Sequence, residues 1–129
     1  MNRGEAQSPD LADLRTTVRV EPGLVVVELV GTARVSTVGA MRAAFGRARA
    51  IPGLLPVVAL VEAVTFLDPL GVGVLALEQL AAHEQGREFI VCGINPSLGE
   101  MIANLPKPVS LVQAADLDDA YLLAGAIST

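Results

Sequence analysis

The sequence predicts a single α/β domain, built on a mostly parallel β-sheet with an antiparallel N-terminal strand and about four helices. The first reason is length, because 129 residues suit one domain of ordinary size. The second is composition: 52% of the residues are hydrophobic but only 3% are aromatic, so the core must be aliphatic. The third is the alternation of β-branched runs with helix-period segments in the order ββαβαβαβα, which favours right-handed crossovers between parallel strands.

The chain starts with a polar segment and a hairpin. Residues 1–13 carry alternating charges and a proline, so we expect a loose leader, with the domain itself spanning residues 14–129. β-branched residues on either side of Glu21-Pro22-Gly23 predict two strands joined by a tight turn.

A helix is expected after the second strand. Either Ser36 or Thr37 is placed to cap its N-terminus. Pro52 and Gly53 then end it. The apolar residues between these points recur at helical spacing, as one buried face requires: Val38, Met41, Phe45 and Ala48.

The centre of the chain predicts a buried strand, a tight turn and an apolar helix. Residues 56–67 form a continuous run rich in β-branched residues, which is typical of a strand covered on both faces. The turn lies within TFLDPLGVGVL, residues 65–75. Asp68 is suited to cap a helix, and Pro69 fits the first helical position, where its missing N–H has no helical partner in any case. A nearly all-apolar helix then extends to about His83.

Three further elements complete the alternation. Gly86 marks the end of the apolar helix, and residues 87–94 predict the next strand. Residues 95–97, Asn-Pro-Ser, open a helix with an apolar side made of Leu98, Met101, Ile102 and Leu105. Residues 109–113 predict a last strand, and Asp116 is placed to cap a final helix.

Charge and composition exclude several classes of function. A net charge of −5 disfavours binding to nucleic acid or to an anionic membrane surface, and the longest apolar stretch is too short to span a bilayer. The N-terminus lacks the apolar core of a secretory signal, so we expect a cytoplasmic protein. The single cysteine, Cys92, and the single histidine, His83, provide neither a disulfide nor a metal site, and no cofactor is expected. Cys92 is interpreted as core packing and His83 as a residue at a helix C-terminus.

Three segments carry a shared pattern in consistent order and spacing. They are LVGTARVSTVGAMRAA, VVALVEAVTFLDPLGVGVL and VCGINPSLGEMIANL. Together they resemble the STAS family, the domain of bacterial anti-sigma factor antagonists, over about residues 18–126. The positions that match the family's pattern are Gly31, Thr37, Val64, Phe66, Asp68, Gly71, Val72 and Gly73.

The chain departs from this family at its charged and modified positions. In the family, the residue after the loop aspartate is a serine or threonine that is phosphorylated by the anti-sigma factor, which is also a kinase; here it is Pro69. Proline has no oxygen to receive a phosphate. The family's acids at the second-strand exit and within the third strand correspond to Arg34 and Ala59. The resemblance therefore implies the fold but not a phosphorylation switch.

The turn at Asp68 has three interpretations. Because the unphosphorylated form binds the anti-sigma factor in the family, proline implies an antagonist that is always competent to bind. Alternatively, the switch was lost because the partner changed, or Asp68-Pro69 is only a helix cap. Ligands of parallel sheets tend to bind at the carboxyl ends of the strands. The candidate partner-binding residues there are Asp68, Pro69, Leu70, Gly71, Val72, Arg34 and Thr37.

Two further surfaces are left open by the sequence. Apolar residues surround more of the helix after Pro69 than one core-facing stripe needs, which indicates either a partner surface or full burial: Leu70, Val72, Val74, Leu75, Leu77 and Leu80. The only charges between Leu29 and Val61 are Arg34, Arg42, Arg47 and Arg49, which form either a docking face for an acidic partner or a solvated face.

No nucleophile or acid–base pair is visible near Asp68, so the sequence favours a non-catalytic protein. The first hypothesis is a protein-binding regulator that occupies a kinase-like anti-sigma factor. The alternative is a structural adaptor subunit of a membrane transporter or a scaffold complex. A third is a binder of small ligands at the strand ends. Homo-oligomerisation is left open.

Overall fold

The sheet and its helices follow the predicted order. The computed structural model describes residues 13–105 and 110–128, and the predicted leader therefore lies outside the described residues apart from Asp13. The elements are β1 (Leu14–Glu21), β2 (Leu24–Ala33), the short 3₁₀ helix η2 (Val35–Thr37), α1 (Val38–Arg49), β3 (Val57–Leu67), α2 (Pro69–Glu84), β4 (Phe89–Cys92), α3 (Pro96–Ala103), β5 (Gln113–Ala114) and α4 (Leu117–Ser128).

The five strands lie side by side in chain order, β1-β2-β3-β4-β5. β1 is antiparallel to β2 through the two-residue turn Pro22-Gly23, and the other neighbouring pairs are parallel. The predicted α/β class, with one antiparallel strand on a parallel sheet and four helices, is therefore confirmed. Parallel neighbours place the carboxyl ends of β2 and β3 at the same edge of the sheet.

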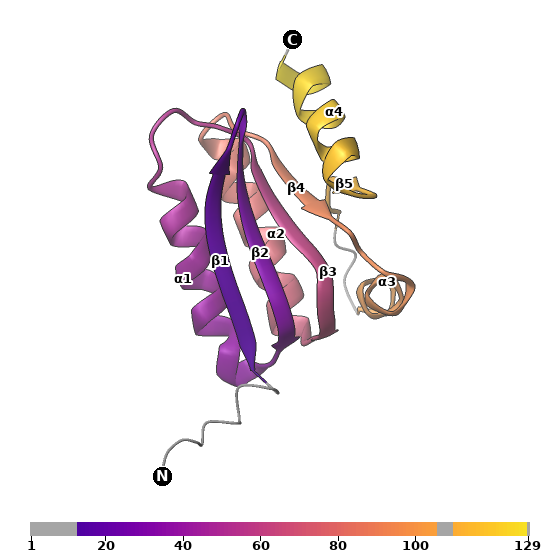
Figure 1. Ribbon diagram of the computed structural model, residues 1–129. Helices are drawn as coiled ribbons and strands as arrows, with labels where there is room; N and C mark the ends of the chain where they lie inside the picture. The colour runs from indigo at the N-terminus through magenta and orange to yellow at the C-terminus, as the bar shows by residue number, and fades with distance from the viewer. Residues whose placement is uncertain (1–12, 106–109, 129) are drawn as a thin grey trace.

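Helices cover the two faces of the sheet unequally (Figure 1). The larger apolar cluster joins one sheet face to α1, α2 and α3, and within it the rings of Phe45 and Phe89 meet edge to face at 5.6 Å. The smaller cluster joins the opposite face to α4, where Ala120 and Ala124 pack on the sheet. Because one helix cannot cover a whole sheet face, the carboxyl-terminal half of β3 is exposed on that side.

Helix termini match the sequence prediction at three places. The side chain of Asp68 accepts a hydrogen bond from Leu70 N, that of Asn95 accepts from Leu98 N, and that of Asp116 accepts from Asp119 N. The expected αL glycine at the end of α2 is Gly86, whose φ is 74°. These caps depend on residues a few positions apart, which is why the sequence is sufficient to predict them.

Two predicted elements differ in detail. The last strand is only Gln113–Ala114, not residues 109–113, of which Val109 lies outside the described residues. The Gln79 side chain of α2 donates to Ser110 O and accepts from Val112 N, so it replaces ladder partners there. In β3, the prediction of a strand buried on both faces is correct only for the first half, because Glu62, Ala63, Thr65 and Phe66 are exposed.

Candidate functional site

The turn between β3 and α2 is a rigid helix start. Asp68 has extended backbone angles, and its carboxylate oxygen Oδ1 accepts from Leu70 N at 2.8 Å. Pro69 is the first residue of α2, where it has no N–H to leave unpaired. Pro69 and Leu70 are nevertheless exposed, with 55% of Leu70 accessible. The prediction of a capped helix is confirmed, and the cap lies at the surface.

The turn is also tied to the neighbouring strand. Asp68 N donates to Ala33 O at 2.8 Å, which fixes the start of α2 at the end of β2. Gly71 permits the close approach, since a Cβ built on it would lie 2.7 Å from Leu67 Cδ1 and 3.7 Å from the Ala33 Cβ. Gly71 and Val72 are buried, with Val72 only 1% exposed. These two predicted partner-binding residues therefore pack in the interior beneath the turn and are not part of its exposed surface.

The exit of β2 forms the second wall of the site. Arg34 is exposed and precedes the turn of 3₁₀ helix, which the sequence did not predict. Thr37 stands at the N-cap position of α1, but its hydroxyl does not cap that helix. Instead it accepts from Arg34 N at 2.8 Å and lies 3.1 Å from Thr32 O. The expectation that Ser36 or Thr37 caps α1 through its side chain is thus wrong, because the hydroxyl stabilises the preceding turn.

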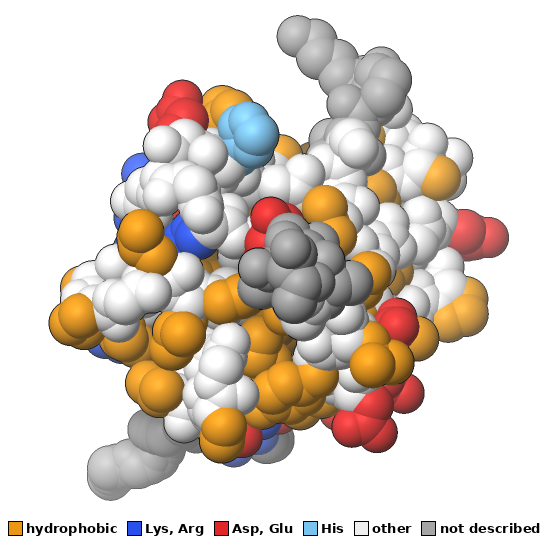
Figure 2. All heavy atoms as spheres, turned by 90° about the horizontal axis from the view of Figure 1, so that it is seen from above, with side chains coloured by type: hydrophobic (Ala, Val, Ile, Leu, Met, Phe, Trp, Pro, Cys, Tyr) orange, Lys and Arg blue, Asp and Glu red, His pale blue; other side chains and the backbone are white. Residues whose placement is uncertain are grey.

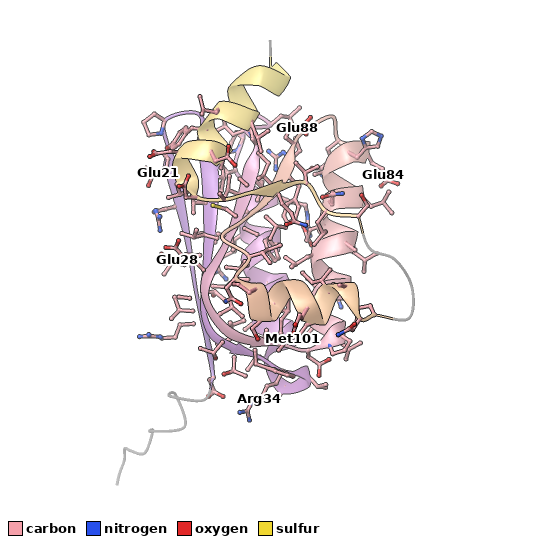
Figure 3. The ribbon with its side chains drawn as sticks, turned by 90° about the vertical axis from the view of Figure 1, so that its right-hand side faces the viewer. Glu21, Glu28, Arg34, Glu84, Glu88 and Met101 are labelled. Atoms are coloured by element: carbon pink, nitrogen blue, oxygen red, sulfur yellow. The ribbon has the colours of Figure 1, made fainter. Side chains whose placement is uncertain are left out.

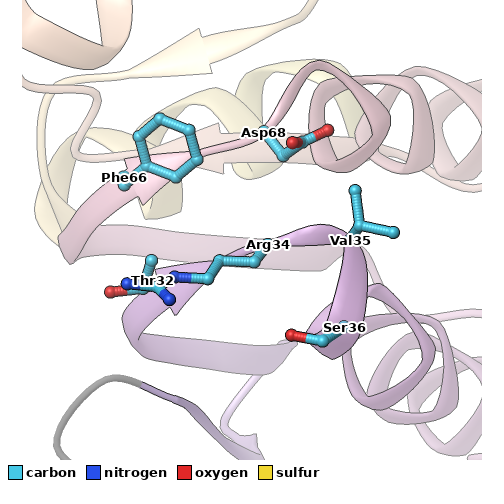
Figure 4. A pocket seen from close by; sticks show the side chains of 6 residues that line it. All are labelled: Thr32, Arg34, Val35, Ser36, Phe66 and Asp68. Atoms are coloured by element: carbon cyan, nitrogen blue, oxygen red, sulfur yellow. The ribbon is translucent and has the colours of Figure 1, made fainter.

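A hollow of about 790 Å³ separates these two walls. In Figure 4, the Arg34 side chain extends across the hollow, while the Asp68 carboxylate points toward the start of α2. No ion pair joins Arg34 to Asp68 among the described residues. The hollow is lined by Thr32, Arg34, Val35, Ser36, Phe66 and Asp68.

Phe66 is exposed because β3 is irregular. Gly31 pairs with Val64 and Thr32 with Phe66, so β3 contains one extra residue between these two pairs. Such a bulge lets two successive side chains emerge on the same side of a strand, here Thr65 and Phe66. Sequence reasoning missed Phe66 and Thr32 as site residues. An aromatic residue two positions before the loop aspartate was the available signal.

A second hollow, of about 340 Å³, lies on the other side of the turn. Phe66 lines both hollows, and the turn lines the first with Asp68 and the second with Pro69, so Phe66 and the turn form a ridge between them. The second hollow reaches across to α3, which Figure 3 marks with Met101. It is lined by Phe66, Leu67, Pro69, Val72, Met101, Asn104 and Leu105.

α2 presents an apolar stripe to the outside. Val72, Val74 and Leu75 are buried, whereas Leu70, Leu77 and Leu80 are each more than half exposed. The alternative of full burial for this helix is therefore wrong. The first of these exposed residues, Leu70, belongs to the turn, and Leu77 and Leu80 follow further along the helix.

The basic residues of this half of the chain do not act as one face. Arg49 of α1 pairs with Glu78 of α2 and so links the two helices. Arg34, Arg42 and Arg47 are exposed and, among the described residues, form no ion pair. On the open sheet face, Arg19 bonds Glu28 and Glu21, and the hydrogen bond to Glu28 is the main reason that the pKa of Arg19 is raised. Only Arg34 brings a cation to the hollow.

Among the described residues that line the hollow, the groups with possible reactivity are hydroxyls and one carboxylate. Thr32 Oγ1 and Thr65 Oγ1 lie 3.3 Å apart, and Thr65 Oγ1 also donates to Gly31 O. Within the described ranges no group of three histidine, cysteine or acidic side chains could hold a metal ion. Cys92 is buried between the sheet and α4, away from this edge, and burial raises its pKa to about 11. The arrangement offers a shaped surface for recognition.

A family model for the STAS domain matches residues 15–112. The chain belongs to the STAS domain family. Among curated proteins, no relative matches the sequence. None of the described helices has the length and apolar character that a bilayer crossing needs.

Solved structures share this STAS fold. An anti-sigma factor antagonist from Mycobacterium paratuberculosis is 24% identical, with a TM-score of 0.66 over 88% of this chain and 96% of its own. A variant of RsbS from Moorella thermoacetica is 17% identical, with a TM-score of 0.73 over 88% of this chain and 97% of its own. The murine anion transporter Slc26a9 is 15% identical, with a TM-score of 0.71 over 89% of this chain and only 22% of its own.

Proposed function

We propose that this STAS domain is a non-catalytic, cytoplasmic regulator of bacterial transcription that binds a kinase-like anti-sigma factor through the turn Asp68–Leu70. The observation that carries the proposal is an exposed apolar ridge held rigidly between two hollows at the strand ends. A surface whose conformation is already fixed loses little entropy on binding. The likeness to anti-sigma factor antagonists supports this class of partner.

The proposed interface has a defined arrangement. Pro69 and Leu70 supply its apolar centre, and Phe66 fills the side facing the sheet. Arg34 supplies a charge that meets an acidic group of the partner, while Asp68 and Thr37 hold the two loops in shape. Buried apolar anchors with a charged rim are the usual composition of such interfaces.

We further propose that the turn has no phosphorylation switch. Pro69 and Leu70 lack an acceptor, and Thr65 is held in β3 by its bond to Gly31 O. Incubation with the kinase-like partner and ATP should leave the peptide of residues 65–75 unmodified in a mass spectrum. A phosphopeptide from this stretch would show that Thr65 had taken over the switch.

The sharpest test of the interface is Pro69→Glu, which introduces a carboxylate at the exposed first position of α2. An acid in the first helical turn is compatible with folding, because it interacts favourably with the helix dipole. If the ridge is buried against a partner, however, the carboxylate is desolvated without a counter-charge, and affinity should fall at least about a hundredfold. Calorimetry with the purified partner measures this, beside a thermal melt of each variant.

The matched control is Pro22→Glu, the same substitution in the exposed hairpin turn at the other end of β2. It should leave affinity unchanged. Equal affinity of a folded Pro69→Glu protein and the wild type would remove the turn from the interface and leave it as a helix cap only.

A structural adaptor is the second candidate, favoured by the likeness to part of an anion transporter. The two functions differ in what they bind. Co-purification with the tagged chain as bait separates them: a kinase-like anti-sigma factor supports the first, and a transporter subunit or scaffold protein supports the second.

A further inference from the structure

At the far end of α2 from the capped turn, one charged side chain is buried without a partner. Arg87 is only 4% exposed. Its nitrogens Nε, Nη1 and Nη2 are all buried, and none has a hydrogen-bond partner within the described part of the chain. A buried guanidinium without acceptors is costly, because it loses its hydration and regains nothing. The guanidinium therefore has unused donors that an acceptor from outside the described residues can satisfy.

The backbone explains how Arg87 reaches this place. Gly86 N donates to His83 O and Arg87 N donates to Ala82 O, the two bonds of a Schellman motif that ends α2. The residue at the Arg87 position of this motif is usually apolar and packs back on the helix. The C-terminal end of a helix favours a cation nearby, but the carbonyls of Ala82 and His83 are occupied by these bonds and the Arg87 guanidinium bonds to no carbonyl among the described residues.

Arg87 is one of the residues that line a hollow of about 290 Å³. The apolar lining residues are Ala76, Leu80, Phe89 and Val112. The polar lining residues are Arg87, His83, Gln79 and Glu88. Gln79 is already engaged with Ser110 and Val112, so Arg87 and His83 are the donors available to a ligand.

This hollow is separate from the proposed partner site. Figure 3 shows Arg34, beside the partner site, and Glu88, beside this hollow, at opposite ends of the molecule. Figure 2 looks at the end where α2 stops and shows the single histidine, His83, at the surface there.

We propose that this hollow binds a small organic carboxylate, with its carboxylate on the Arg87 guanidinium and its apolar body against Leu80, Phe89 and Val112. The planar guanidinium matches a carboxylate in a two-pronged hydrogen bond. His83 supplies a second N–H at the rim. Glu88 also lines the hollow but forms no ion pair with Arg87 among the described residues. Its negative charge repels a doubly charged phosphate more strongly than a singly charged carboxylate.

The test uses hexanoate as the probe, its uncharged amide hexanamide, and inorganic phosphate, at constant ionic strength. The readout is the Arg87 Nε–H resonance and the backbone amides around the hollow, followed by ¹⁵N NMR. Hexanoate should shift these signals saturably, and hexanamide should bind at least about tenfold more weakly because it loses the charge-assisted bonds.

Two variants of Arg87 and one control variant test whether hexanoate binds at this residue. Arg87→Met should weaken hexanoate binding at least about tenfold, and Arg87→Lys, which keeps the charge but not the fork, should weaken it as well. Arg42→Met, the same change at an exposed arginine of α1, should bind as the wild type does. A melt of each variant verifies that it is folded.

Three results would overturn the proposal. The first is no saturable shift in folded wild-type protein, meaning that the guanidinium is solvated by water only. The second is equal binding of hexanoate and hexanamide, or of the wild type and Arg87→Met. The third is tighter binding of phosphate than of hexanoate, which would replace the carboxylate class with an inorganic oxyanion.

Discussion

The two ends of α2 differ in how their polar groups find hydrogen-bond partners. At the N-terminal end, Asp68 caps the helix and donates its own N–H to Ala33 O. At the C-terminal end, the backbone is equally well satisfied by the Schellman bonds at Gly86, yet the next side chain, Arg87, is buried with no acceptor. At the N-terminal end the polar groups described here have hydrogen-bond partners, and an apolar ridge is exposed. At the C-terminal end the backbone bonds are made, but the buried Arg87 side chain lacks an acceptor among the described residues.

This difference indicates two kinds of binding. An exposed apolar surface on a satisfied, rigid turn suits a protein partner, whose association buries it. A buried cation that lacks a partner suits a small anionic ligand, because the free energy lost on desolvation is recovered only when an acceptor arrives. The predictions below test whether the two ends differ in this way.

The largest expected change in stability is at Arg87, after the C-terminal end of α2. Arg87→Met removes the unpaired charge and keeps an unbranched apolar stem, so the free energy of unfolding without ligand should rise by about 1–4 kcal/mol. Urea titration measures it. Arg42→Met, at an exposed site, should stay within about 0.5 kcal/mol of the wild type. A destabilised Arg87→Met protein would mean that the guanidinium is well solvated, and the contrast between the two ends would disappear.

The next largest change in stability is expected at Gly71, where the N-terminal end of α2 packs closely on Leu67 and Ala33. Gly71→Val places a branched side chain against Leu67 and Ala33 and should destabilise the fold by about 1–3 kcal/mol. Gly73→Val is the matched control, since a Cβ on Gly73 meets nothing within 4 Å. Its unfolding free energy should remain near that of the wild type or above it, because glycine is the poorer helix former. Equal losses at both positions would contradict a special role for Gly71.

The cap itself has a smaller effect. Asp68→Ala leaves Leu70 N without its side-chain acceptor and should cost about 1 kcal/mol, whereas Asp68→Asn should cost little because asparagine caps equally well. Thermal melts of the two variants compare them directly. If Asp68→Ala and Asp68→Asn lose the same stability, then the negative charge of Asp68 stabilises the fold and its capping hydrogen bond does not.

The smallest expected effect is at Cys92, a buried thiol that can be compared with the buried guanidinium of Arg87. Desolvation is the main cause that raises its pKa to about 11, with smaller contributions from the charges of Glu62, Asp116 and Asp119. A thiol avoids the cost of burying a charge because its protonated form is neutral, whereas a guanidinium carries its charge in the protonated form. Native protein at pH 8 should therefore react with a thiol reagent far more slowly than unfolded protein. Rapid labelling of the native state, or a disulfide-linked dimer under mild oxidation, would contradict this.

The same shift gives a pH dependence of stability. The pKa is higher in the folded state, so the folded state holds its proton more tightly, and this contribution is complete below about pH 9. The free energy of unfolding should fall as the pH rises toward 11. Cys92→Ala should lack this component, which a comparison of urea titrations at pH 8 and pH 10.5 measures.

The sequence by itself determined the features that depend on neighbouring residues. The hairpin at Pro22-Gly23, the caps of α2, α3 and α4 and the αL glycine at Gly86 follow from contacts within a few positions. The order of strands and helices along the chain, and the mostly parallel sheet with an antiparallel first strand, followed as well from the alternation of the two patterns. The position of the proposed partner-binding turn at the carboxyl ends of the strands was a consequence of that order.

Tertiary structure decided what depends on register and packing between distant segments. The bulge that exposes Phe66 exists only in the pairing of β3 with β2, and the burial of Gly71 and Val72 depends on how closely α2 approaches Ala33. The Gln79 side chain bonds to the segment before β5 from 31 and 33 positions away. Arg87 lines a hollow together with residues of α2, β4 and that segment. Such contacts have no local pattern, since the free energy that selects them comes from surfaces that meet only when the chain is folded.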